Sequence, residues 1–136
     1  MPDDFKTLPL PATSAGPDVL LIDDDPGVRH SLTLLLEAHG LSVLAAADGE
    51  RGLEAFRAHP PKVVLTDILM PEQDGIGTIL QMRRERPHAK IVAMSGGGRV
   101  DKADYLTAAE KLGADAAIEK SNIDELIEIL LALLKP

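Results

Sequence analysis

The sequence has no cysteine and no tryptophan, and its phenylalanines and single tyrosine together amount to 2% of the residues. The lack of cysteine excludes a disulfide framework, a thiolate metal site and a cysteine nucleophile. Hydrophobic residues still make up 45% of the chain, so a core is possible, and it must be built from aliphatic side chains. With 136 residues, the chain has the length of one domain.

The sequence also lacks a long apolar run and an excess of positive charge. No stretch of about 18 apolar residues is present, so we expect no membrane insertion. The net charge of −8 repels a phosphate backbone, so we expect no direct contact with nucleic acid. The N-terminus does not have the basic start and apolar core of a signal peptide, so a cytoplasmic location is expected.

A change in composition divides the chain near residue 18. Residues 1–17 contain four prolines and few large apolar side chains, which is typical of a disordered leader. Residues 18–136 keep a regular alternation of apolar runs and helical patterns. We therefore predict a leader over 1–17 and one folded domain over 18–136.

That alternation predicts the fold class. Short apolar runs favour strands, and the segments between them carry apolar residues at helical spacing. Strands that are apolar almost throughout are typical of a parallel sheet covered on both faces, so we predict a doubly wound α/β domain. The predicted strands are 18–23, 42–46, 62–67, 90–94 and 116–118, and the predicted helices are 26–39, 48–58, 75–85, 101–112 and a last helix, capped by Ser121 or Asn122, that runs to about 134.

Acidic residues end two of the predicted strands. Asp23 and Asp24 follow the first strand, and Asp67 ends the third. Sites in doubly wound sheets lie beyond the carboxyl ends of the strands, so the three carboxylates meet if these strands are neighbours. Clustered carboxylates repel and need a cation, and all-oxygen ligands favour Mg²⁺. The alternative is that these side chains only face water, as we expect of Asp25, which reads as the cap of a helix beginning at Pro26.

Two further strand ends carry polar groups. Ser95 follows the fourth strand and precedes three glycines, 96–98, whose backbone N–H groups are unobstructed. A hydroxyl beside such groups suits a tetrahedral oxyanion, although a flexible glycine turn is the alternative. Lys120 follows the fifth strand and is a candidate counter-charge, with a solvated surface lysine as the alternative.

Together these motifs resemble those of the receiver domains of two-component response regulators, over about residues 18–134. The resemblance implies a flavodoxin-like sheet of five parallel strands in the order 2-1-3-4-5, with five helices. The motifs that carry it are Leu21-Ile-Asp-Asp24, Asp67-Ile-Leu-Met-Pro, Asp74-Gly75, Met94-Ser95-Gly96, Leu112-Gly-Ala114 and Lys120.

The resemblance also implies a role for each site residue. Asp67 is the phosphoacceptor, Ser95 the switch hydroxyl, and Lys120 the partner of the phosphoryl group. Mg²⁺, with Mn²⁺ as a substitute, is bound by Asp23, Asp24, Asp67 and the backbone carbonyl of Leu69. The phosphodonor is a sensor histidine kinase or a histidine phosphotransferase.

The implied function is two-component phosphorelay signalling by a stand-alone receiver that is not a dedicated enzyme. Output is expected through a downstream protein or self-association, on the surface of the helix over 101–112, the strand over 116–118 and the last helix. Two alternatives stay open: a pseudo-receiver that only binds a partner, and a Mg²⁺-dependent phosphatase of similar fold.

The sequence departs from the family at two positions and is unusual in its last helix. Ser121 stands where relatives usually have a proline after the lysine, so we expect the Lys120–Ser121 peptide bond to be trans. Ala117 stands where relatives usually have an aromatic ring that moves on activation. The last helix has more apolar side chains than one buried stripe needs, so we expect some to be exposed.

Overall fold

A five-stranded parallel sheet forms the centre of the computed structural model, which describes residues 16–70, 73–95, 107, 109–111 and 113–135. The strand order is β2-β1-β3-β6-β7, which is the order 2-1-3-4-5 of the parallel strands and confirms the prediction. The strands are β1 (Val19–Ile22), β2 (Val43–Ala46), β3 (Val63–Asp67), β6 (Ile91–Ser95) and β7 (Ala116–Glu119).

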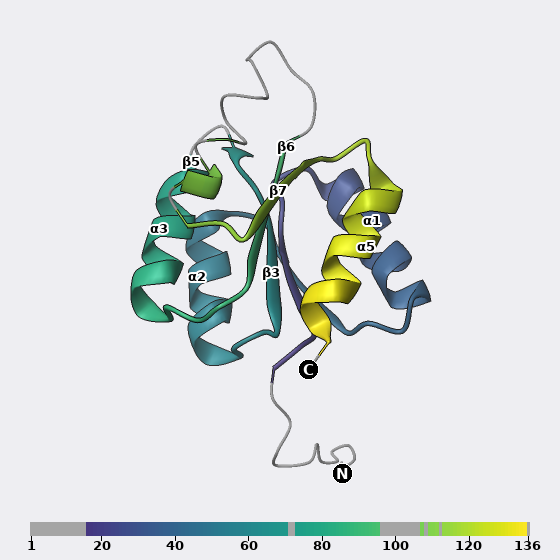
Figure 1. Cartoon of the computed structure of the whole chain (residues 1–136), viewed down its shortest axis with the longest axis horizontal. Coiled ribbons are helices and arrows are strands. Elements are labelled where there is room, and N and C mark those ends of the chain that lie inside the picture. The colour runs from purple at the N-terminus through teal and green to yellow at the C-terminus, as the bar shows by residue number, and fades with distance from the viewer. Residues whose placement is uncertain (1–15, 71–72, 96–106, 108, 112, 136) are drawn as a thin grey trace.

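Helices cover both faces of this sheet, as the apolar strands predict (Figure 1). Helices α2 (Gly49–Ala58) and α3 (Gly75–Glu85) lie on one face, and α1 (Pro26–Ala38) and α5 (Ile123–Leu134) lie on the other. The helix predicted over 101–112 and the glycines at 96–98 lie wholly or largely outside the described residues, as does most of the leader, 1–15.

The alternation of side chains along β1 divides the core into two layers. Leu20 and Ile22 pack with Phe56 of α2, whereas Val19 and Leu21 pack with Leu36 of α1. All of these side chains are buried, and successive residues of a strand point to opposite faces of the sheet. The same pattern explains why the strands read as continuous apolar runs.

The start of α1 follows the predicted signals, and a glycine marks its end. The carboxylate of Asp25 accepts hydrogen bonds from the backbone N–H groups of Gly27 at 2.8 Å and Val28 at 3.2 Å, and Pro26 opens the helix. Gly40 has a φ of 84°, a backbone conformation that glycine adopts without strain, and it ends the helix. Asp25 is therefore committed to capping, as predicted.

The segment after β3 contains a short antiparallel hairpin. Strands β4 (Leu69–Met70) and β5 (Gln73–Asp74) pair in it, and α3 follows at once. A Cβ atom on Gly75 would lie 2.5 Å from the Cα of Ile68 and 2.6 Å from the backbone oxygen of Asp67. This position therefore requires glycine because the chain folds back directly onto the end of β3.

The apolar last helix buries three of its large side chains against the sheet and keeps most of the others partly exposed. Leu126, Ile127 and Leu130 are buried, and Leu131 keeps 38% of its surface exposed. The expected exposure is confirmed for Leu131 but does not extend to the whole outer face. Among the described residues, no helix has the length and apolar character that a membrane crossing demands.

Candidate functional site

The predicted acidic cluster forms where β1 and β3 end side by side. The register pairs Ile22 of β1 with Thr66 of β3. The next residues, Asp23 and Asp67, therefore lie side by side at the same edge of the sheet. Carboxylate oxygens of Asp23, Asp24 and Asp67 lie within 4.8 Å of one another. Asp23 is 0% exposed and Asp67 is 3% exposed, while Asp24 lies nearer to solvent. The reading in which these residues merely face water is therefore wrong for Asp23 and Asp67.

Three polar atoms of Asp23 are held by hydrogen bonds: its backbone N–H, its Oδ1 and its backbone carbonyl. Its backbone N–H donates to the carbonyl of Ala46 at 3.1 Å, which extends the pairing with β2 by one residue. Its Oδ1 accepts from the backbone N–H of Asp25 at 2.9 Å. Its backbone carbonyl accepts from Nη1 of Arg29 at 2.7 Å. The first carboxylate of the cluster is thus rigidly placed.

Lys120 bridges the two buried carboxylates. Its Nζ forms an ion pair with Oδ2 of Asp23 at 2.7 Å and donates to Oδ2 of Asp67 at 3.0 Å. The Lys120 side chain is 18% exposed. Burial opposes the ammonium charge, but the contacts with Asp23 and Asp67 outweigh it and raise the pKa of Lys120. The reading of Lys120 as a solvated surface lysine is wrong.

The backbone places this lysine at the strand ends. The N–H of Lys120 donates to the carbonyl of Ser95 at 2.9 Å, which joins the end of β7 to the end of β6. The Lys120–Ser121 peptide bond is trans, as predicted. Ala117 lies half-buried in β7 against the core. The serine after Lys120 therefore does not keep the ammonium from the carboxylates.

Ser95 brings a hydroxyl to the same edge of the sheet. It is the last residue of β6, directly after Met94, which pairs with Asp67. The side chain is fully buried, and its Oγ has no hydrogen-bond partner among the residues that the structure describes. A buried polar atom without a partner is unfavourable by about 1–3 kcal/mol. The hydroxyl is thus available to an oxyanion bound at this edge.

The charges of the site fit a divalent cation. Three carboxylates face one ammonium group, so the cluster keeps an excess of negative charge. Its donors are oxygen atoms, which hard ions such as Mg²⁺ prefer. Leu69 opens β4 two residues beyond Asp67, and the role of its backbone carbonyl as a ligand stays a prediction.

Sequence reasoning missed Arg29 and the close approach of Gly75. A signal for Arg29 was present, because a basic side chain near the N-terminus of a helix opposes the helix macrodipole. The unfavourable interaction with the macrodipole must be offset by another contact. In this protein that contact is the hydrogen bond from Arg29 to the backbone carbonyl of Asp23. Gly75 was noted only as part of a motif, and its contact with the backbone of β3 depends on the tertiary fold.

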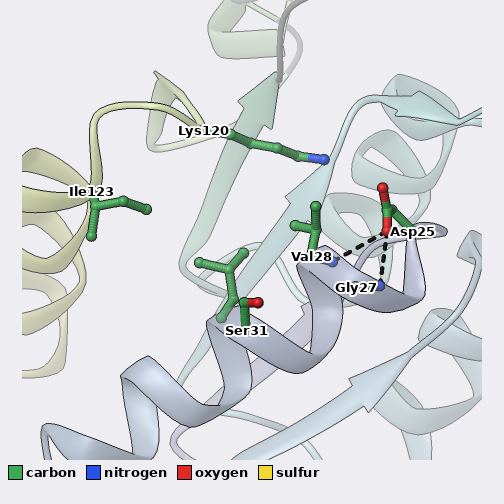
Figure 2. Close-up of a pocket in the computed structure, with 7 residues that line it drawn as sticks. Asp25, Gly27, Val28, Ser31, Lys120 and Ile123 are labelled. Atoms are coloured by element: carbon green, nitrogen blue, oxygen red, sulfur yellow. Dashed lines mark hydrogen bonds between the residues drawn. The ribbon is translucent and has the colours of Figure 1, made fainter.

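A groove of about 460 Å³ opens beside the cluster, between the first half of α1 and the start of α5 (Figure 2). Apolar side chains of Val28, Leu32 and Ile123 line it, and Lys120 reaches across its rim. The ammonium group of that lysine is the one that contacts Asp67. A partner seated in the groove would therefore lie next to the carboxylates.

Comparison with known proteins gives one family. The family model described as "Response regulator receiver domain" matches residues 19–131. A probable transcriptional regulator, ycf27, of Porphyridium aerugineum is 38% identical over 104 residues, 75% of this chain and 41% of the relative. The transcriptional regulatory protein CseB of Streptomyces avermitilis is 36% identical over 102 residues, 75% of this chain and 42% of the relative. The chain thus spans about two fifths of the length of these curated relatives.

Solved structures agree with the strand order and the sheet. A response regulator receiver domain protein from Clostridium thermocellum superposes with a TM-score of 0.77 at 27% identity, over 85% of this chain and 92% of that one. The response regulator protein TrrA from Thermotoga maritima, solved in complex with Mg²⁺-BeF, gives a TM-score of 0.75 at 28% identity, over 85% of this chain and 96% of that one.

Proposed function

We propose that this chain, which belongs to the family of response regulator receiver domains, accepts a phosphoryl group on Asp67 in a two-component phosphorelay. The observation that carries the proposal is the contact of Lys120 with Asp67 inside the acidic cluster. This contact joins the buried carboxylate of Asp67, at the end of β3, to the ammonium group of Lys120. The positive charge of that group can neutralise part of the charge of a transferred phosphoryl group. The chain acts as a phosphoacceptor and not as a dedicated enzyme.

The residues at the strand ends supply what this transfer requires. A carboxylate oxygen of Asp67 attacks the phosphorus, a new O–P bond forms, and the bond from phosphorus to the nitrogen of a donor phosphohistidine breaks. Catalysis of phosphoryl transfer depends on positioning and on neutralising the equatorial oxygens. The ammonium group of Lys120 and the hydroxyl of Ser95 would contact those oxygens, which is supported by the bond of Lys120 to Asp67 and by the lack of a partner for the Ser95 hydroxyl among the described residues.

The acidic cluster fits Mg²⁺, with Mn²⁺ as a substitute. Asp23, Asp24 and Asp67 would hold the ion through carboxylate oxygens, together with the backbone carbonyl of Leu69. When bound, the ion supplies positive charge to the phosphoryl oxygens. The complex of TrrA with Mg²⁺-BeF, in a domain 28% identical to this one, supports the assignment.

The groove beside the cluster suits the phosphodonor. Its apolar lining from α1 and α5 fits one face of a helix, and its rim lies at Lys120. We propose that a sensor histidine kinase or a histidine phosphotransferase seats the helix bearing its phosphohistidine there, in the cytoplasm. For output, we propose a downstream protein or a second copy of the chain at the surface of the helix predicted over 101–112, β7 and α5.

Treatment with acetyl phosphate and Mg²⁺, followed by mass spectrometry after an acid quench, tests this function. We expect the wild type to gain the mass of one phosphoryl group, located on Asp67 by peptide mapping. The Asp67→Asn variant should gain none, and the matched control Asp124→Asn, in the exposed first turn of α5, should behave as the wild type. Turnover of acetyl phosphate without an adduct would instead favour a phosphatase, and no reaction would favour a pseudo-receiver.

A further inference from the structure

We infer that Arg29 is a positioning residue for the acidic metal site, and that it acts by fixing the peptide group between Asp23 and Asp24. The inference rests on the proposed function, because it concerns the site that would hold Mg²⁺. Arg29 lies in α1 and is half-buried, and its Nη1 donates to the backbone carbonyl of Asp23 at 2.7 Å. That carbonyl lies one residue beyond the end of β1.

The contact matters most for Asp24. The side chain of Asp23 is already fixed by the N–H of Asp25 and by Lys120. By contrast, no residue within the described ranges donates a hydrogen bond to the carboxylate of Asp24. The direction of the Asp24 side chain therefore follows from its backbone. The Arg29 guanidinium holds the carbonyl of the peptide group that leads into Asp24, and so limits rotation of that group.

The mode of contact indicates a geometric role and not a neutralising one. Within the part of the chain that the structure describes, Arg29 forms no ion pair with a carboxylate, in contrast to Lys120. Its positive charge near the N-terminus of α1 is opposed by the helix macrodipole, so the helix gains nothing from it electrostatically. Because the Arg29 guanidinium binds a backbone carbonyl, it leaves the carboxylates available to a cation. At the same time it fixes the backbone that carries them.

The positioning role and the charge of Arg29 predict opposite effects on metal affinity. Removing a positive charge near three carboxylates should make a divalent cation bind more tightly. Removing the clamp on the peptide should make it bind more weakly, since loss of a group that orients a ligand typically lowers metal affinity by about 10-fold to 100-fold. The direction of the change in affinity therefore separates the two roles.

Isothermal titration of the full chain with MgCl₂ tests the inference on the wild type and three variants. Arg29→Met keeps an apolar stem but removes the donor and the charge, Arg29→Lys keeps a donor and the charge, and Arg84→Ala removes an exposed arginine of α3. We expect Mg²⁺ to bind about 10-fold more weakly to Arg29→Met. Arg29→Lys should recover at least part of that loss, and Arg84→Ala should match the wild type.

Thermal unfolding without Mg²⁺ accompanies each titration and shows whether the variants are folded. Mg²⁺ affinity of Arg29→Met equal to or tighter than that of the wild type would overturn the inference, as would equal weakening in Arg29→Lys and Arg29→Met. A lowered unfolding temperature with unchanged Mg²⁺ affinity would assign Arg29 to the fold alone. If the wild type itself fails to bind Mg²⁺, the proposed function fails first, so the two failures are distinguishable.

Discussion

The ammonium group of Lys120 lies 3.0 Å from a carboxylate oxygen of Asp67, although the two residues are 53 positions apart in the sequence. The same group lies 2.7 Å from Asp23. One cation thus offsets part of the repulsion among three converging carboxylates. The cluster still keeps an excess of negative charge, which suits the divalent ion proposed for it.

Removing this cation should destabilise the domain. The Lys120→Met variant leaves two buried carboxylates without their counter-charge, and we expect its free energy of unfolding to fall by about 3 kcal/mol in the absence of Mg²⁺. Urea unfolding measures the change. The control is Lys62→Met, because Lys62 is exposed in its ion pair with Asp18, and the pair should contribute less than about 1 kcal/mol. Equal effects of the two substitutions would contradict the bridging role of Lys120.

The raised pKa of Lys120 predicts how stability depends on pH. Because the folded-state pKa lies above the ordinary lysine value of about 10.4, the folded protein binds the proton more tightly than the unfolded chain does. The stabilisation is therefore complete below that value and is lost as the pH rises through the folded-state pKa. The difference in unfolding free energy between the wild type and Lys120→Met should shrink above pH about 10.4. A difference that stays constant there would refute the coupling.

Neutralising one carboxylate should stabilise the domain while it impairs the site. In Asp24→Asn the repulsion falls, so we expect the free energy of unfolding without Mg²⁺ to rise by about 1 kcal/mol. The ion loses a ligand, so Mg²⁺ affinity and the rate of phosphorylation by acetyl phosphate should both fall. Calorimetry measures the Mg²⁺ affinity, and mass spectrometry measures the rate of phosphorylation. Undiminished phosphorylation of this variant would rule out Asp24 as a ligand.

Gly75 directly follows the hairpin and packs against the end of β3, so its replacement should disturb both. A methyl group at this position would collide with the backbone of Asp67 and Ile68, so Gly75→Ala should lower the unfolding free energy by about 1–3 kcal/mol and slow phosphorylation. The same substitution at Gly77, which is exposed in α3, should be neutral or stabilising by up to about 1 kcal/mol. Similar effects at both positions would show that the close contact is unimportant.

The sequence alone determined the features that depend on near neighbours. Continuous apolar runs predicted β1 and β3, and helical spacing predicted α1, because each pattern reports which faces of an element are buried. The capping of α1 by Asp25 was equally readable, since the cap and the N–H groups that it satisfies lie within three residues. The strand order came from the resemblance to known receivers, and the pairing in the structure confirms it.

The tertiary structure decided which of these residues meet. The β4–β5 hairpin, the contact of Gly75 with the backbone of β3 and the reach of Arg29 to the carbonyl of Asp23 leave no periodic trace in the sequence. The ion pairs of Lys120 with Asp23 and Asp67 arise because parallel pairing brings the ends of β1, β3 and β7 to one edge of the sheet. Local patterns fix how each segment folds, whereas distances between side chains on separate strands are set only when the sheet packs between its helices.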